Sequence, residues 1–390
     1  MDQQLVNDIE RYAHDCHDEE LELLRQLTRI PAPTRHEERR ADFVASWLHA
    51  HGASDVHIDG AKNVICQLGP RDATELVVFS AHTDVVFDDE DELPLEESNG
   101  RLLGPGVGDD TANLVGLLMA TRYLLERPEL LPHKLGVLVV ANSCEEGLGN
   151  LDGMRAVFDA FAGRIRSFVS FDTYLPNLVD TAVGSHRWRI DVTTQGGHSY
   201  YDFGRPNAIA ELAALVCKLY AQVPADGTLM AAGAPVTLNV GRIEGGTTVN
   251  AIAAQAHALY EYRSTSDEAL GVMRTQLEAI VAAHQREGVT IELSCIGIRP
   301  GNGAVDAQAL AELTQRNAAI IRRVTGEEPH LSPSSTDANI PLSRGIPANN
   351  VGAVRGALLH TRDEWIEKAS LVDGLRVILE VMLSSWQDEA

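Results

Sequence analysis

Histidine and acidic residues follow three apolar segments of this 390-residue chain. His82 and Asp84 come directly after one segment, Glu145 and Glu146 follow another, and Asp172 ends a third. Imidazole and carboxylate groups are common ligands of zinc and related divalent ions. Of two adjacent glutamates, one can bind a metal while the other acts as a general base. These residue types therefore indicate metal-assisted hydrolysis, although a hydrogen-bonded loop histidine is an equally good interpretation of His82 taken alone.

A second acidic pair, Asp109 and Asp110, lies in a glycine-rich segment directly before a predicted helix at 112–125. Aspartate is a common N-cap residue, and glycines allow the backbone to turn tightly. A capped helix after a turn explains one of the two aspartates. The adjacent second aspartate favours a further role, such as metal binding.

The elements that position these residues are predicted to be strands of a parallel sheet. The apolar runs 76–80, 135–141 and 168–171 are typical of strands buried on both faces, and helices are predicted between them, including 151–161. Open α/β sheets bind ligands at the carboxyl ends of their strands. We therefore expect the acidic residues and His82 to meet at one edge of a layered α/β domain.

The remaining segments divide the chain into two domains. After about residue 184 the pattern changes to β-α-β-β-α-β, which is typical of a ferredoxin-like fold, and the α/β pattern then returns. We predict a catalytic domain at 1–184 and 300–390 with an inserted domain at 185–299. The other predicted elements of the catalytic domain are helices at 18–29, 37–51 and 307–323, strands at 55–58 and 63–68, and ordered segments at 337–344 and 371–384.

Charge and composition argue against several classes of protein. Lys and Arg number 32 and Asp and Glu number 56, so the formal net charge is −24. Nucleic acid and anionic membrane surfaces would repel such a chain. We identify no apolar run long enough to span a bilayer and no signal peptide, and five widely spaced cysteines indicate a reducing compartment, so we expect a cytoplasmic protein. The acidic run 84–97 is interpreted as a solvated loop or, alternatively, as a device that repels acidic substrates.

Five separated motifs resemble those of the two-zinc exopeptidase and amidohydrolase family. This family includes peptidase T, carboxypeptidase G, aminoacylase, acetylornithine deacetylase and succinyl-diaminopimelate desuccinylase. The resemblance covers nearly the whole chain and rests on the motifs His82-Thr83-Asp84, Gly108-Asp109-Asp110, Glu145-Glu146-Gly147, Gly196-Gly197-His198-Ser199 and Leu359-His360-Thr361-Arg362-Asp363-Glu364.

The resemblance implies two zinc ions, with cobalt or manganese as substitutes that accept the same ligands. It implies that Asp109 bridges the two ions. His82 and Asp172 would complete one site, and Glu146 and His360 the other. The peptide bond that follows Asp109 resembles one that is cis in this family.

The resemblance also implies catalytic and substrate-binding roles. Asp84 would orient the first histidine ligand, and Glu145 would be the general base. His198 would polarise the scissile carbonyl, in many members from the partner subunit of a homodimer formed through the inserted domain, which acts as a lid and dimerisation domain. Asn250 and Arg263 would contact the substrate. The guanidinium of Arg263 would bind a carboxylate group of the substrate.

Three functions remain open after this comparison of motifs. An aspartate at position 172 is commoner among aminopeptidase-type members of the family, which favours an aminopeptidase or dipeptidase acting on a small peptide. The alternative substrate is an N-acyl amino acid. A non-catalytic metal-binding scaffold is disfavoured because the whole set of proposed ligands and Glu145 is retained.

Overall fold

The computed structural model describes residues 1–386 and divides the chain into two compact units. The first unit comprises Met1–Thr181 and the chain from Gly303 onwards, and the second comprises Ala182–Asn302. The division falls next to the predicted domain boundaries.

The first unit is built on an eight-stranded sheet with the order β1-β2-β6-β3-β7-β18-β8-β17. β3 pairs in parallel with β6 and β7, and β7 pairs in parallel with β18. The sheet is therefore mostly parallel at its centre, as predicted, while β2 and β8 pair with antiparallel neighbours. The strands of this sheet are β1 (Val56–Ile58), β2 (Val64–Leu68), β3 (Leu76–His82), β6 (Gly136–Asn142), β7 (Ile165–Phe171), β8 (Asn177–Val179), β17 (His330–Leu331) and β18 (Ala348–Val351).

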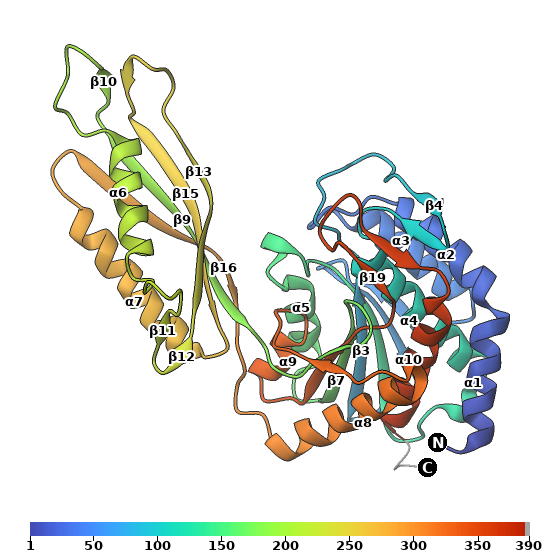
Figure 1. Ribbon diagram of the computed structural model, residues 1–390. Coiled ribbons are helices and arrows are strands. Elements are labelled where there is room, and N and C mark those ends of the chain that lie inside the picture. Colours follow the sequence, from blue (N-terminus) through green and yellow to red (C-terminus); the bar gives the residue numbers. More distant parts are fainter. Residues whose placement is uncertain (387–390) are drawn as a thin grey trace. The chain divides into compact units, whose positions relative to one another are not determined.

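Helices cover both faces of this sheet (Figure 1). Phe79 of β3 packs against Trp386, which follows α10, with ring centroids 6.3 Å apart. On the other face Phe168 of β7 packs against Phe158 of α5 at 5.7 Å. The helices of this unit are α1 (Gln3–Asp15), α2 (His17–Arg29), α3 (Glu38–Ala50), α4 (Asn113–Leu125), α5 (Asp152–Ala160), α8 (Ala307–Thr325), α9 (Asn339–Ser343) and α10 (Ser370–Ser384).

A smaller four-stranded sheet lies in the same unit, with the order β19-β20-β5-β4. It joins the segment before α4 to the segment before α10, because β5 pairs with β20. Its strands are β4 (Glu96–Ser98), β5 (Arg101–Leu103), β19 (Gly356–Ala357) and β20 (Trp365–Glu367).

The second unit has the element order β9-α6-β13-β15-α7-β16 around an antiparallel sheet of order β13-β15-β9-β16. This is the split β-α-β arrangement. Its elements are β9 (Gly184–Thr194), β10 (Gly197–His198), α6 (Ala208–Tyr220), β11 (Met230–Ala231), β12 (Ala234–Pro235), β13 (Thr237–Gly245), β14 (Ala251–Ile252), β15 (Gln255–Ser264), α7 (Asp267–His284) and β16 (Val289–Arg299).

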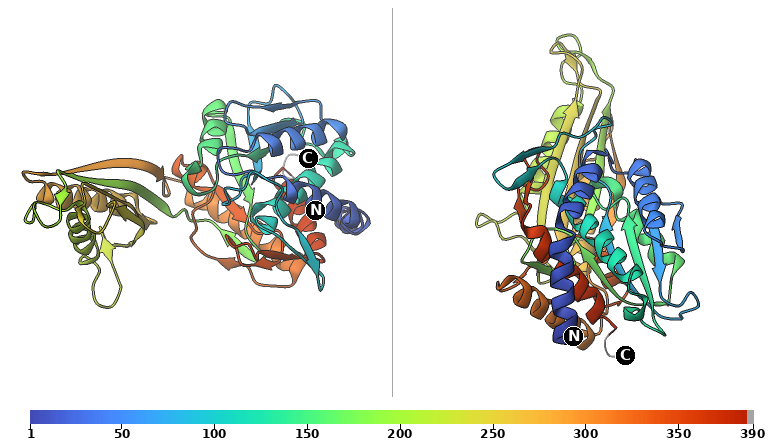
Figure 2. Two further views of the ribbon diagram at one scale, coloured as in Figure 1. Left: turned by 90° about the horizontal axis from the view of Figure 1, so that it is seen from above. Right: turned by 90° about the vertical axis from the view of Figure 1, so that its right-hand side faces the viewer.

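Both long helices of the second unit pack on one face of its sheet, as the views in Figures 1 and 2 agree. Trp188, Ile190 and Val192 of β9 point into the core that the sheet shares with these helices. The residues between them, including Arg189 and Asp191, lie on the opposite face and form an ion pair at 2.8 Å. Along β9, buried and more exposed residues therefore alternate between the two faces of the sheet.

Among the described residues, no helix is long and apolar enough to cross a membrane. The five cysteines are all free, as their spacing indicated.

Candidate metal centre

Three adjacent parallel strands bring the predicted ligands to one edge of the sheet. β3 ends at His82, β7 ends immediately before Asp172, and β6 leads through a short turn to Glu145 and Glu146. These four side chains are buried, each with a relative exposure of 7% or less. The shared edge predicted from the apolar runs is thus observed.

Asp109 reaches the same place from the segment Val107–Ala112, directly before α4. It is 8% exposed, and the peptide bond between Asp109 and Asp110 is cis, as expected. His360 lies in the connection between β19 and β20, and its side chain is 57% exposed.

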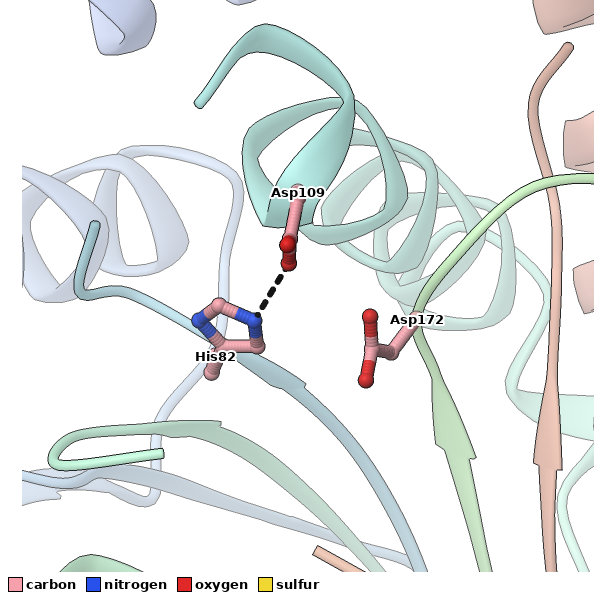
Figure 3. A group of neighbouring side chains, drawn as sticks. All are labelled: His82, Asp109 and Asp172. Atoms are coloured by element: carbon pink, nitrogen blue, oxygen red, sulfur yellow. Dashed lines mark hydrogen bonds and ion pairs between the residues drawn. The ribbon is translucent and has the colours of Figure 1, made fainter. Parts of the chain in front are cut away.

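The Asp109 carboxylate lies between two imidazoles. Its Oδ1 is 3.0 Å from Nε2 of His82, and its Oδ2 is 3.0 Å from Nε2 of His360. Figure 3 shows His82 and Asp109 pointing toward one another, with the carboxylate of Asp172 facing them. A carboxylate with one oxygen toward each histidine has the arrangement of a bridging ligand between two metal ions.

The described residues contain three groups whose ligand atoms lie within 4.8 Å of one another. Asp109 belongs to two of these groups, one with His82 and Asp172 and the other with Glu146 and His360. The third group contains His82, Glu145 and Glu146. Three or more nitrogen and oxygen donors at this spacing can surround a divalent cation.

The electrostatics of the centre indicate an excess of buried negative charge. Burial and the nearby Asp109 raise the pKa of Glu146 to about 7. The same two causes raise the pKa of Asp172 well above its ordinary value. Hydrogen bonds to Asp109 and Glu146 raise the pKa of His360 to about 11. A positive charge at the centre would stabilise all the ionised carboxylates at once.

The hydrogen bonds of His82 also fit a metal ligand. Its Nδ1 donates to the backbone carbonyl of Asp84 at 3.0 Å, so the neutral ring presents a lone pair on Nε2. That lone pair faces Oδ1 of Asp109, another acceptor. Two facing acceptors require a proton or a metal cation between them. The surrounding carboxylate oxygens and imidazole nitrogens are suitable ligands for a metal cation.

Asp84 contacts the backbone amides of Glu145 and Glu146 more closely than it contacts the imidazole of His82. Its Oδ1 accepts the backbone N–H of Glu145 at 3.0 Å, and its Oδ2 accepts that of Glu146 at 2.9 Å. The hydroxyl of Thr34 also donates to Oδ2, at 2.9 Å. The carboxylate lies 3.5 Å from the imidazole, so the backbone carbonyl is the nearer partner of the histidine.

Two other buried carboxylates bind backbone amides beside the centre, a role that sequence reasoning did not assign to either of them. Asp110 accepts the backbone N–H of His82 at 2.7 Å, and Glu364 accepts that of Asp109 at 2.8 Å. The signal for Asp110 was its position beside Asp109. Glu364 lay within a recognised motif, but its partner is 255 positions earlier in the sequence.

His198 belongs to the second unit, at the end of the short strand β10 that follows β9. Its backbone N–H donates to Asp202 at 2.7 Å, and its Nδ1 accepts backbone N–H groups of Tyr200 and Tyr201 at 3.2 and 3.4 Å. Because Nδ1 accepts, the neutral ring carries its proton on Nε2. The imidazole is exposed and can donate a hydrogen bond from that atom.

The structure places Asn250 near His198 but Arg263 far from both. β10 pairs with β14, and the N–H of Ser199 donates to the carbonyl of Asn250 at 3.0 Å. Arg263 pairs with Ser185 at the other end of β15, eight positions beyond Gln255, which corresponds to roughly 26 Å. Its guanidinium binds both carboxylate oxygens of Glu261, at 3.0 and 3.1 Å.

The acidic run 84–97 is joined to basic residues of the first unit. Its members Asp89 and Glu97 form ion pairs with Arg362 at 2.7 Å and with Lys368 at 2.8 Å. These contacts support the interpretation of this run as a solvated loop that the surface holds in place.

Comparison with known proteins identifies the family. The family model "Peptidase family M20/M25/M40" matches residues 78–384. YqjE, a Bacillus subtilis protein of uncharacterised function, is 25% identical over 378 residues, which cover 93% of this chain and 97% of its own. Succinyl-diaminopimelate desuccinylase of Nitrosomonas eutropha is 27% identical over 314 residues, which cover 76% of this chain and 79% of its own.

The fold matches a solved structure over almost its whole length. The aminopeptidase PepT from Bacillus cereus superposes with a TM-score of 0.71 at 19% identity, covering 94% of this chain and 98% of that chain. The match extends over most of the chain and includes the buried cluster at the ends of β3, β6 and β7. The chain belongs to peptidase family M20/M25/M40 and is a metal-dependent hydrolase of peptide or acyl-amino-acid amide bonds.

Proposed function

We propose that this chain is an aminopeptidase or dipeptidase that hydrolyses the amide bond of a small peptide with the help of two zinc ions. The observation that carries the proposal is the buried cluster in which Asp109 faces both His82 and His360. The likeness to an aminopeptidase and the aspartate at position 172 support a peptide substrate.

The two ligand groups that share Asp109 divide naturally between two ions. We assign His82 and Asp172 to one ion, Glu146 and His360 to the other, and Asp109 to both, because this division follows the clustering of the ligand atoms. Cobalt or manganese can replace zinc with these ligands. The free cysteines agree with a reducing compartment, and we place the protein in the cytoplasm.

When bound, two such ions lower the pKa of a shared water and polarise the scissile carbonyl. Glu145 takes a proton from the attacking water and delivers it to the departing nitrogen. Its position depends on Asp84, which holds the amides of Glu145 and Glu146. The 5% exposure of Glu145 keeps bulk water from competing for that proton.

His198 of a second copy of the chain donates from Nε2 to the carbonyl oxygen, since its Nδ1 is occupied by backbone N–H groups. We propose a homodimer through the second unit because the motif resemblance implies a histidine from the partner subunit and because exposed aromatic side chains surround His198. Asn250, adjacent to His198, contacts the same substrate. Because Arg263 lies roughly 26 Å from the His198 end of the sheet within one chain, a small substrate held by His198 of the second copy would reach Arg263 only in the first copy. Its carboxylate would then compete with Glu261 for the guanidinium.

The alternative substrate is an N-acyl amino acid, which the likeness to a desuccinylase supports. A panel of di- and tripeptides with free amino termini, set against acetyl- and succinyl-amino acids, separates the two. We expect higher kcat/KM for the peptides. Cleavage of the acylated compounds alone would overturn the peptidase assignment.

A further inference from the structure

We propose that Glu364 is a positioning residue of the metal centre, whose carboxylate fixes Asp109 while its own segment of chain fixes His360. The affinity for metal then depends on a residue that does not itself touch the metal. The inference rests on the proposed assignment of Asp109 and His360 as ligands.

Glu364 is fully buried and accepts four hydrogen bonds. Its Oε2 accepts the N–H of Gly106 at 2.8 Å. Its Oε1 accepts the N–H of Gly108 at 3.0 Å, the N–H of Asp109 at 2.8 Å and the hydroxyl of Tyr174 at 2.8 Å. Three of the four donors belong to the segment that carries Asp109, so the carboxylate determines the path of that segment.

The packing around the Glu364 carboxylate leaves no room for a side chain at position 108. A Cβ added to Gly108 would lie 2.6 Å from the ring of Tyr174 and 2.9 Å from Oε1 of Glu364. The backbone of Glu364 adds a further constraint, because its carbonyl accepts the N–H of Gly104 at 2.9 Å. Asp109 is thus held in one position before any metal binds.

The same residue anchors the segment that carries His360, four positions earlier. Apart from His360 itself, the neighbouring residues of that segment make contacts at the surface: Thr361 donates to the carbonyl of Leu358, and Arg362 pairs with Asp89. Glu364 is its buried contact with the centre. It therefore sets the distance at which His360 meets Asp109.

The chemistry of the cradle requires a carboxylate. Its donors are three amides and a phenol, none of them cationic, and together they satisfy both oxygens. A glutamine at this position would turn an NH₂ group toward backbone N–H donors. The segment would then shift and carry Asp109 with it.

The experiment measures zinc affinity of the full-length, metal-free protein by competition with a chromophoric chelator. Replacing a residue that orients a metal ligand typically weakens metal binding about 10–100-fold, and we expect this loss for Glu364→Gln. The matched control is Glu380→Gln, which removes an equally buried carboxylate that pairs with Arg323 on α8. We expect Glu380→Gln to bind zinc as the wild type does.

Tyr174→Phe removes one donor to Glu364 and leaves the carboxylate in place, so we expect a smaller loss of affinity. Wild-type affinity in Glu364→Gln would overturn the inference. If that variant does not fold, wild-type affinity in Tyr174→Phe would overturn it instead. Asp109→Asn tests the ligand assignment separately from the role of Glu364. Unchanged zinc binding in Asp109→Asn would contradict the assignment of Asp109 as a ligand. Weaker zinc binding in Asp109→Asn together with wild-type binding in Glu364→Gln would contradict only the role of Glu364.

Discussion

The two regions that carry the proposed chemistry each contain an aspartate that binds the backbone amides of a functional residue. In the first unit Asp84 binds the amides of Glu145 and Glu146, and in the second Asp202 binds the amide of His198. Asp84 is completely buried, whereas the side chain of Asp202 is 26% exposed. One region is fixed inside a core, and the other is a loop held at the surface.

The metal centre is therefore built from residues of one unit of a single chain. The segment around His198, in contrast, leaves apolar side chains exposed that a partner could cover. The proposed metal ligands lie together within one unit, and buried carboxylates such as Asp84 hold the backbone that carries them. Beside His198, in contrast, Tyr200, Tyr201 and Phe203 are 80%, 82% and 90% exposed. Clustered exposed apolar groups are typical of interaction sites. The comparison therefore supports metal binding by a single chain and catalysis by a dimer.

Metal removal should have the largest effect, and only on the buried region. Dialysis against a chelator should abolish hydrolysis, because the water and the carbonyl lose their activation. Thermal melting should also shift downward, since a ligand at 1,000 times its Kd stabilises a fold by about 4 kcal/mol. Added zinc, cobalt or manganese should restore both. Full activity of the metal-free protein would contradict the account.

Loss of His198 should break the exposed region while leaving the buried one intact. Removing a donor to a developing oxyanion typically lowers kcat about 10²–10³-fold, and we expect this for His198→Ala with normal metal content. Mixing it with Glu145→Gln under conditions of subunit exchange should regain activity, because a mixed dimer then contains one complete site. No regain despite exchange would place His198 and Glu145 of one site on the same chain.

The two aspartates allow a direct comparison of the regions. Asp84→Asn should lower metal affinity or kcat/KM about 10–100-fold, since one NH₂ group would face the amides of the glutamates. Asp202→Asn should have a smaller effect on kcat/KM and none on metal affinity, because its partners are one exposed amide and the exposed guanidinium of Arg205. Equal effects of the two variants would contradict the distinction between a fixed, buried region around Asp84 and an exposed region around Asp202.

The smallest effect should come from Glu97, which lies outside both sites. Hydrogen bonds from Arg25 and Lys368 lower its pKa to about 2. Because the folded pKa lies below the unfolded value, this contact stabilises the fold above about pH 4.3 and loses its effect as the pH falls toward 2. Its side chain is 36% exposed, so Glu97→Gln should cost less than about 1 kcal/mol at pH 7.

Urea unfolding at pH 7.0 and pH 3.5 measures the difference in free energy of unfolding between the wild type and Glu97→Gln. It should shrink at the lower pH, and kcat/KM should not change. A difference that grew as the pH fell would contradict the conclusion that folding lowers the pKa of Glu97.

The sequence predicted the elements that depend on apolar pattern. The runs that became β3 and β6 are buried at every position, so they could be identified without knowing their neighbours. β18 was missed because two of its four residues are asparagines, Asn349 and Asn350. Their amides are satisfied by buried partners such as Asn317 and Ser170, which only the fold brings near.

The candidate site was predictable to the extent that its residues follow strands. α1 was missed although Leu5, Ile9 and Ala13 recur at helical spacing, so the signal for this helix was present in the sequence. The motifs identified His82 and Asp109 but not their supports. The hydrogen bond from Asp109 to Glu364 closes a loop of 255 positions, and no local pattern contains that information.

The most direct test of the central claim is the turnover of Glu145→Gln with its metal content measured on the same sample. We expect the variant to retain two metal ions per chain, because Glu145 is not assigned as a ligand. We also expect kcat to fall about 10²–10⁴-fold, the range for loss of a general base. Wild-type turnover with both ions bound would contradict the proposed role of Glu145 in hydrolysis.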